Sequence, residues 1–365
     1  MIFFKNLSVL TAQENRASCG VFMKTIFKIA KLLSEQTALF VSLAALLAFA
    51  EPGLFLWIKG PAQTAILGFI MLAMGMTLSA DDFRILAKRP LDIFIGACAQ
   101  YTLMPLLAFA IVKTANLPQG VAVGLLLVGT CPGGVSSNIM SFLAKGDVAF
   151  SVGMTTASTL LSPIITPILM LMLSGENVEV DAWGMFKSIM IVTLLPVICG
   201  AVLNGIFSEK QSYKDAMKIM PAFGVICLAL IVAGVTAHHG GGFLSASIAI
   251  FCAIAAHNAL GYLSGYVIGV LTGMKTAQRR TISIEVGCQN AGLATNLAST
   301  HFQALPEAAL ASAAACVYHS LSGTILANAF ALYDKYSKRK SLSLVRLVLR
   351  LFALYDKYSK RKSAE

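Results

Sequence analysis

The chain has 365 residues, of which 57% are hydrophobic and only 12% charged, with a formal net charge of +11. Soluble domains contain about 45–50% apolar and about 25% charged residues, so this composition excludes an ordinary water-soluble protein and predicts one embedded in lipid. The basic residues stand in short loops and in the C-terminal YDKYSKRKS, without a basic and aromatic stripe, so we expect no nucleic-acid partner. The eight cysteines show no metal-binding spacing, and we expect buried thiols and no cofactor.

Ten apolar stretches follow one another, each long enough to cross about 30 Å of hydrocarbon. They cover residues 34–51, 62–80, 91–113, 118–143, 147–173, 183–207, 217–237, 242–271, 277–302 and 305–330. The sequence therefore predicts an all-α polytopic membrane protein with ten transmembrane helices, preceded by a segment at 1–33. The basic tail at 331–365 contains FALYDKYSKRKS twice, at 330–341 and 352–363, which favours a recent duplication or a cloning scar over a functional module.

The distribution of lysine and arginine between alternate loops predicts the orientation in the membrane. The loops on the side of both termini carry ten basic residues: Arg84, Lys88, Arg89, Lys145, Lys210, Lys214, Lys218, Lys275, Arg279 and Arg280. The opposite side carries three: Lys59, Lys113 and Lys187. Ten against three predicts that both termini lie in the cytoplasm.

The fourth and ninth apolar stretches are both interrupted. The fourth contains Cys131-Pro132-Gly133-Gly134, and the ninth contains Gly287-Cys288-Gln289-Asn290. Each is the fourth of five stretches, and an odd number of spans per set reverses the direction in which the second set enters the membrane. Paired interrupted helices in matching positions are typical of inverted-repeat transporters. We therefore predict two inverted five-helix repeats, at 34–173 and 183–330, with discontinuous fourth and ninth helices.

Glu285 is the strongest single indication of function, because it lies inside an apolar stretch. An ionised carboxylate at the centre of a bilayer costs several kcal/mol unless it is compensated, so such residues usually mark ion pathways. Neutral oxygens accompany it on the predicted spans: Gln100, Ser137, Asn138, Ser151, Thr155 and Gln289. One carboxylate among neutral oxygens suits a hard monovalent cation.

Three motifs carry a family resemblance over about residues 30–330. They are CPGGVSSNIMSFLAKGDVAFSVGMTTASTLLSPIITP, IEVGCQNAGLATNLA and GMTLSADDF, and together they resemble the bile acid:sodium symporter family. The resemblance implies a core of spans 3–5 and 8–10 beside a panel of spans 1, 2, 6 and 7. It implies a first sodium site at Ser137, Asn138, Ser151, Thr155 and Glu285. It implies a second at Gln100, Glu285, Gln289 and the backbone carbonyls of Val286 and Cys288, while Asn290 and His319 match positions near the substrate cavity.

The expected function is therefore sodium-coupled import of a small organic anion by alternating access, with two sodium ions for each substrate. Bile acids, pantothenate or pantoate, and 2-oxo acids are all compatible with the sequence. We expect a multi-pass protein of a bacterial inner membrane that works as a monomer. Two alternatives stay open: a proton-coupled anion carrier that uses Glu285, and an intramembrane serine protease with Ser136 as nucleophile and His319 as base.

Overall fold

A computed structural model describes residues 25–34, 36–79, 82, 84, 88–134 and 136–362, with the backbone alone at 239–247, 249 and 337–362. Within these ranges the regular structure is helical apart from one isolated β-bridge. The elements are α2 (Thr37–Ala50), η1 (Pro52–Leu54), α3 (Pro61–Thr77), α5 (Pro90–Thr114), α6 (Gln119–Thr130), α7 (Ser137–Leu143), α8 (Val148–Leu173), α9 (Ala182–Ile189), η2 (Met190–Leu194), α10 (Leu195–Phe207), α11 (Gln211–Met217), α12 (Met220–Leu271), α13 (Thr276–Gly287), α14 (Ala291–His301) and α15 (Pro306–Lys362). The predicted all-helical class is confirmed.

The described residues contain six helical stretches that are long and apolar enough to cross a membrane. They are Pro90–Thr114, Val148–Leu173, Ala182–Phe207, Met220–His238, Ile250–Leu271 and Pro306–Tyr336. Helix α2 forms a further candidate with Thr25–Ser34, to which it is bent by 80°, and α3 and α6 are shorter apolar helices. The predicted spans at 118–143 and 277–302 are each divided between two short helices, α6 with α7 and α13 with α14.

One boundary differs from the expectation. A loop is predicted between the spans at 217–237 and 242–271, but α12 stays helical from Met220 to Leu271. The glycines at 240–242 do not end the helix, because glycine retains the N–H group that proline lacks. The span at 183–207 contains Pro196 and is not interrupted by it. A π-helical turn, Met190–Leu194, lies just before this proline and connects α9 to α10.

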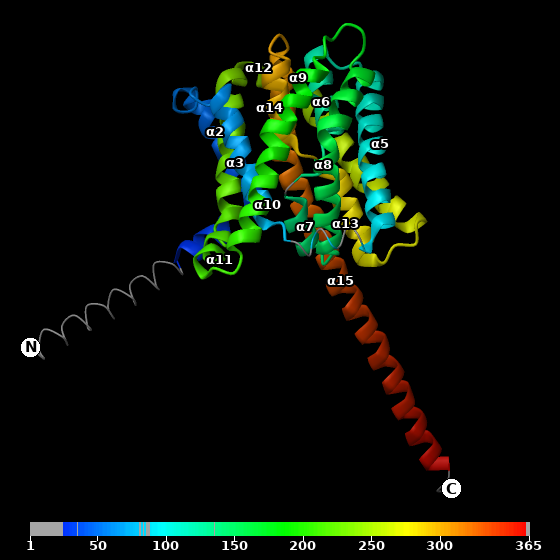
Figure 1. Ribbon diagram of the computed structural model, residues 1–365. Helices are drawn as coiled ribbons and strands as arrows, with labels where there is room; N and C mark the ends of the chain where they lie inside the picture. The colour runs from blue at the N-terminus through cyan, green and yellow to red at the C-terminus, as the bar shows by residue number, and fades with distance from the viewer. Residues whose placement is uncertain are drawn as a thin grey trace, which may run out of the picture.

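The helices form a bundle from which the C-terminal part of α15 projects (Figure 1). We call this end of the bundle the tail end; Thr25–Ser34 and α11 also lie there, and the opposite end is the far end. Helix α3 packs against α10 and α12, whereas α5 packs against α6 and α8, and α14 packs against α15. The residues at the two breaks, 131–134 and 288–290, are all buried within this bundle.

Candidate functional site

The two helix breaks meet in the interior and cross. Gly133 forms an antiparallel bridge with Gln289, the Gly134 N–H donates to the Cys288 carbonyl at 2.8 Å, and the Asn290 N–H donates to the Pro132 carbonyl at 2.8 Å. A Cβ atom on Gly134 would lie 2.7 Å from the Gln289 carbonyl oxygen, so only glycine permits this approach. Backbone groups outside helices must find partners when no water is present, and here each break supplies them to the other.

Glu285 lies beside this crossing and is only 1% exposed. Its carboxylate accepts hydrogen bonds from hydroxyl groups of two other helices: Ser137 of α7 at 2.6 Å, Thr155 of α8 at 2.8 Å, and Ser151 of α8. The Ser151 hydroxyl also lies 2.8 Å from the Asn138 Oδ1 atom. The structure therefore brings together all five residues of the predicted first sodium site, although they come from three helices.

The residues of the predicted second sodium site are joined separately. Gln100 of α5 donates through Nε2 to the Gln289 side chain and, at 3.2 Å, to the Cys131 carbonyl. The Gln289 amide in turn donates to the Val286 carbonyl at 2.6 Å. The Cys288 carbonyl accepts from the Gly134 backbone, as part of the crossing. Within the described residues, the hydrogen bonds of the Glu285 carboxylate go to the first group, so the geometry does not join it to Gln100.

A cavity of about 470 Å³ opens beside the crossing. Its walls come from α3, the start of α12, α7, the start of α8, α14 and α15. The lining runs from Gln289 and Asn290 at the crossing to the last residue of α3, Thr77, and to Met220, which begins α12 directly after α11 of the tail end. Most of this lining is apolar, and among the described residues that form it there is no lysine or arginine.

At the far end, by contrast, side-chain hydrogen bonds hold neighbouring helices together. Three bonds join α14 to α3 and α9: Gln63 to Ser299 at 3.4 Å, Asn296 to Thr64 at 3.1 Å, and Ser188 to His301 at 2.8 Å. The cavity therefore approaches one end of the bundle only.

The two predicted substrate residues both line the cavity. The Asn290 side chain caps α14, with Oδ1 accepting from the Leu293 N–H at 3.0 Å. His319 accepts the Gln289 N–H through Nδ1 at 3.3 Å, and its buried Nε2 has no hydrogen-bond partner among the described residues. A buried polar atom without a partner costs about 1–3 kcal/mol, and Nε2 is available for a hydrogen bond at this wall of the cavity. Because Nδ1 accepts the Gln289 N–H, a neutral His319 ring carries its proton on Nε2, which then cannot accept a proton from Ser136 as the base would have to do.

Sequence reasoning missed several polar residues at the crossing. The Ser141 hydroxyl lies 3.1 Å from that of Ser151, and the Ser158 hydroxyl accepts from the Gly133 N–H at 3.2 Å. Asn258 of α12 donates to the Gly287 carbonyl at 2.8 Å, which satisfies the end of α13. Spacing could have indicated the serines, because Ser141 follows Ser137 by four residues on one helix face. Nothing in the sequence links Asn258 to a residue 29 positions away.

Comparison with known proteins identifies the family of the chain. Residues 64–245 match the model of the sodium bile acid symporter family. The chain is 42% identical over 305 residues to a Bacillus subtilis protein named as an uncharacterized sodium-dependent transporter, YocS, covering 84% of this chain and 94% of the relative. It is 39% identical over 314 residues to the Arabidopsis thaliana probable sodium/metabolite cotransporter BASS1, covering 86% and 77%. A rice relative named as the probable sodium/metabolite cotransporter BASS2 is 35% identical over 300 residues, covering 82% and 71%.

Proposed function

Because this chain belongs to the sodium bile acid symporter family, we propose that it is a symporter that uses a sodium gradient to import a small organic monoanion. The observation that carries the proposal is the placement of Glu285, buried and contacted by hydroxyl groups of two other helices beside paired helix breaks. A membrane transporter of this family has no need of a nucleophilic serine, so the protease alternative is not retained.

The donors around Glu285 support sodium as the coupling ion. One carboxylate, three hydroxyls and an amide oxygen are hard ligands, which suit an alkali ion better than a transition metal. The described residues contain no cluster of three or more His, Cys, Asp and Glu side chains, so the charge here matches a monovalent cation better than a divalent one. We propose a second sodium ion at Gln100, Gln289 and the Val286 carbonyl, and no other cofactor. A proton carrier would need the carboxylate but not the amides of this second group.

The cavity supports an anion with one charge and an apolar body. Its walls are mostly apolar, they include the acidic Asp82, and no described basic residue lines them. A dicarboxylate would therefore enter without a compensating cation. A single carboxylate has suitable donors in the N-terminal end of α14, whose dipole contributes about half a positive charge, and in the unpaired Nε2 of His319. Branched 2-oxo acids, pantoate and pantothenate are of this type, and bile acids are larger members of it.

A binding screen with purified protein tests this proposal. We expect 2-oxoisovalerate, pantothenate or taurocholate to raise the melting temperature in sodium chloride, and to bind at least tenfold more weakly when choline replaces sodium. The uncharged amide of each compound is its matched control, and succinate tests the preference for one charge. Sodium-independent binding, or tighter binding of succinate, would contradict the proposed function. Stabilisation that follows an imposed pH change instead of sodium would favour the proton-coupled carrier.

We also propose the finer architecture that the sequence indicates. The broken pairs α6–α7 and α13–α14 would be the fourth and ninth of ten membrane spans, in inverted repeats at 34–173 and 183–330. Helices α5 to α8, the second span of α12 and α13 to α15 would form the core. Helices α2, α3, α9, α10 and the first span of α12 would form the panel. The hydrogen bonds that close the far end join these two units, so alternating access would require them to break while the tail end closes.

The orientation is a separate prediction. Because basic residues gather at the tail end, we expect both termini in the cytoplasm of a bacterial inner membrane and the cavity open toward the cytoplasm. A green fluorescent protein fused to the C-terminus should fluoresce, whereas alkaline phosphatase at the same position should be inactive. Fusions at Glu176, in the loop between α8 and α9, serve as the opposite control. An active phosphatase at the C-terminus would overturn this orientation.

A further inference from the structure

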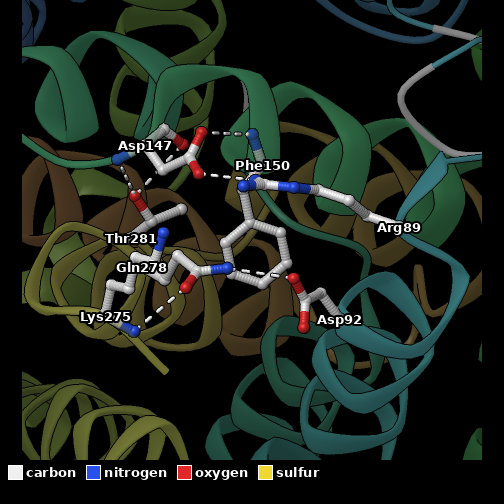
Figure 2. A network of polar contacts seen from close by, with 7 residues as sticks. All are labelled: Arg89, Asp92, Asp147, Phe150, Lys275, Gln278 and Thr281. Atoms are coloured by element: carbon white, nitrogen blue, oxygen red, sulfur yellow. Dashed lines mark hydrogen bonds and ion pairs between the residues drawn. The ribbon is translucent and has the colours of Figure 1, made fainter. Parts of the chain in front are cut away.

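A polar cluster at the tail end joins the N-terminal ends of three helices, α5, α8 and α13 (Figure 2). We call it the clasp and define it as Arg89, Asp92, Asp147, Gln278 and Thr281. Asp147 is its centre: Oδ1 caps α8 by accepting the Phe150 N–H at 3.1 Å, and Oδ2 accepts from Arg89 Nη1 at 2.6 Å. None of these residues belongs to the two predicted sodium sites or lines the cavity.

Asp147 and Thr281 hold α8 and α13 together through the backbone. The Asp147 N–H donates to the Thr281 hydroxyl at 2.8 Å, and that hydroxyl lies 3.2 Å from the Asp147 carbonyl. Thr281 is fully buried. A Cβ atom on the neighbouring Gly146 would lie 2.5 Å from the same hydroxyl, so the loop before α8 packs tightly over it. This contact fixes the position of the first turn of α8 along the axis of α13.

Gln278 and Asp92 hold α13 against α5 in the same way. The Gln278 Nε2 atom donates to Asp92 Oδ2 at 2.9 Å, while its Oε1 accepts the Lys275 N–H at 3.0 Å and so caps α13. One side chain thus satisfies the start of α13 and also connects it to α5, the helix that carries Gln100.

The clasp lies one helical turn from the candidate cation site. Ser151 follows Asp147 by four residues, and Glu285 follows Thr281 by four residues. Four residues advance a helix by about 6 Å, so a fixed contact at Asp147 and Thr281 sets the relative height of Ser151 and Glu285 one turn deeper. We infer that the clasp is a positioning device, and that its Thr281 hydroxyl holds α8 and α13 in the register that brings Ser151 and Thr155 onto the Glu285 carboxylate.

The clasp has two parts, an ion pair and a buried hydroxyl contact, which should contribute differently. The Arg89–Asp147 ion pair is partly exposed, with the Arg89 side chain 39% accessible, and exposed ion pairs contribute little. The Thr281 hydroxyl is buried and binds the backbone of Asp147. Replacing Asp147 with asparagine would leave this backbone contact intact. Removing the hydroxyl should therefore weaken sodium binding more than removing the charge.

The inference rests on the proposed sodium coupling, and the experiment separates the two. Full-length protein is titrated with sodium chloride, and the half-saturating concentration is read from the melting temperature and from uptake. We expect Thr281→Val to raise this concentration about fivefold, the effect of losing roughly one hydrogen bond's contribution to positioning. Thr281→Ser should restore the wild-type value. Asp147→Asn should have a smaller effect, because the cap and the backbone contact remain. The maximal uptake rate at saturating sodium should be retained in all three.

The matched control is Thr193→Val, which removes a buried hydroxyl that has no hydrogen-bond partner among the described residues and lies in η2, outside the clasp. An equal shift in Thr193→Val, an unchanged sodium affinity in Thr281→Val, or a larger loss in Asp147→Asn would each overturn the positioning role. If Thr281→Val does not fold, Asp92→Ala should raise the half-saturating sodium concentration instead, and an unchanged value would overturn the inference. Absence of sodium binding by the wild-type protein would refute the proposed function itself.

Discussion

Glu285→Gln should abolish sodium-driven uptake while leaving the protein folded in the membrane. The amide keeps the size of the carboxylate, and its one oxygen can still accept from the Ser137 hydroxyl, whereas the NH2 group that replaces the other oxygen cannot accept from Thr155. It cannot neutralise a cation. Loss of a buried charged partner costs about 3 kcal/mol or more, which corresponds to at least a hundredfold weaker sodium binding. Protein yield should not fall, because removing a buried charge lowers the cost of membrane insertion.

The measurement is uptake of a radiolabelled substrate into proteoliposomes with sodium or choline outside. Glu307→Gln is the matched control, because it makes the same chemical change at an exposed carboxylate in the first turn of α15. The control should transport like the wild type. Wild-type uptake by Glu285→Gln, at an unchanged sodium concentration for half-maximal rate, would show that the carboxylate is not a cation ligand.

Coupling to two sodium ions should make transport electrogenic. With a monovalent anion, two sodium ions move one net positive charge inward in each cycle. A tenfold sodium gradient supplies about 1.4 kcal/mol per ion, and a potential of about 100 mV supplies about 2.3 kcal/mol for the net charge. Together these give about 5 kcal/mol, enough for accumulation on the order of several thousandfold. One sodium ion with a monoanion is electroneutral and gives only about tenfold accumulation under the same gradient.

Vesicles with a potassium diffusion potential distinguish the two schemes. Uptake should rise when the interior is made negative, and its sodium dependence should have a Hill coefficient above one. Gln100→Leu removes the amide that contacts Gln289 and leaves the Glu285 group intact, so it should lower the Hill coefficient toward one. Uptake that ignores voltage and depends linearly on sodium would leave only the one-ion scheme.

Local signals in the sequence led to Glu285 and to the hydroxyl residues that the structure places beside it, but not to Asn258 of α12. Glu285 stands alone in an apolar stretch, and glycine and proline at 132–134 mark a helix break. Ser151 and Thr155 are four residues apart, so a helix places them on one face. The helix identities and the breaks follow from the same local rules, and the structure has both breaks, between Thr130 and Ser137 and between Gly287 and Ala291.

The features that could not be predicted are mostly contacts between segments that are distant in the sequence. The bond between Asp147 and Thr281 joins residues 134 positions apart, and in the sequence Asp147 resembles any charge in a short loop. The continuity of α12 through three glycines was not predicted, because glycine has a low helix propensity and three in a row favour a loop. The division of the polar residues between the Glu285 and Gln100 groups likewise becomes visible only when α5, α8 and α13 are placed together.

The crossing of the two breaks also constrains how the protein is made. Pro132 leaves the ribosome 158 residues before Asn290, the residue whose N–H satisfies its carbonyl. Until then, the Pro132 carbonyl and the Gly134 N–H lack the partners that satisfy them in the finished arrangement. Closing so long a loop is also entropically unfavourable and slow. The first break should therefore not reach its final hydrogen bonding during synthesis until the segment that carries Asn290 has been inserted.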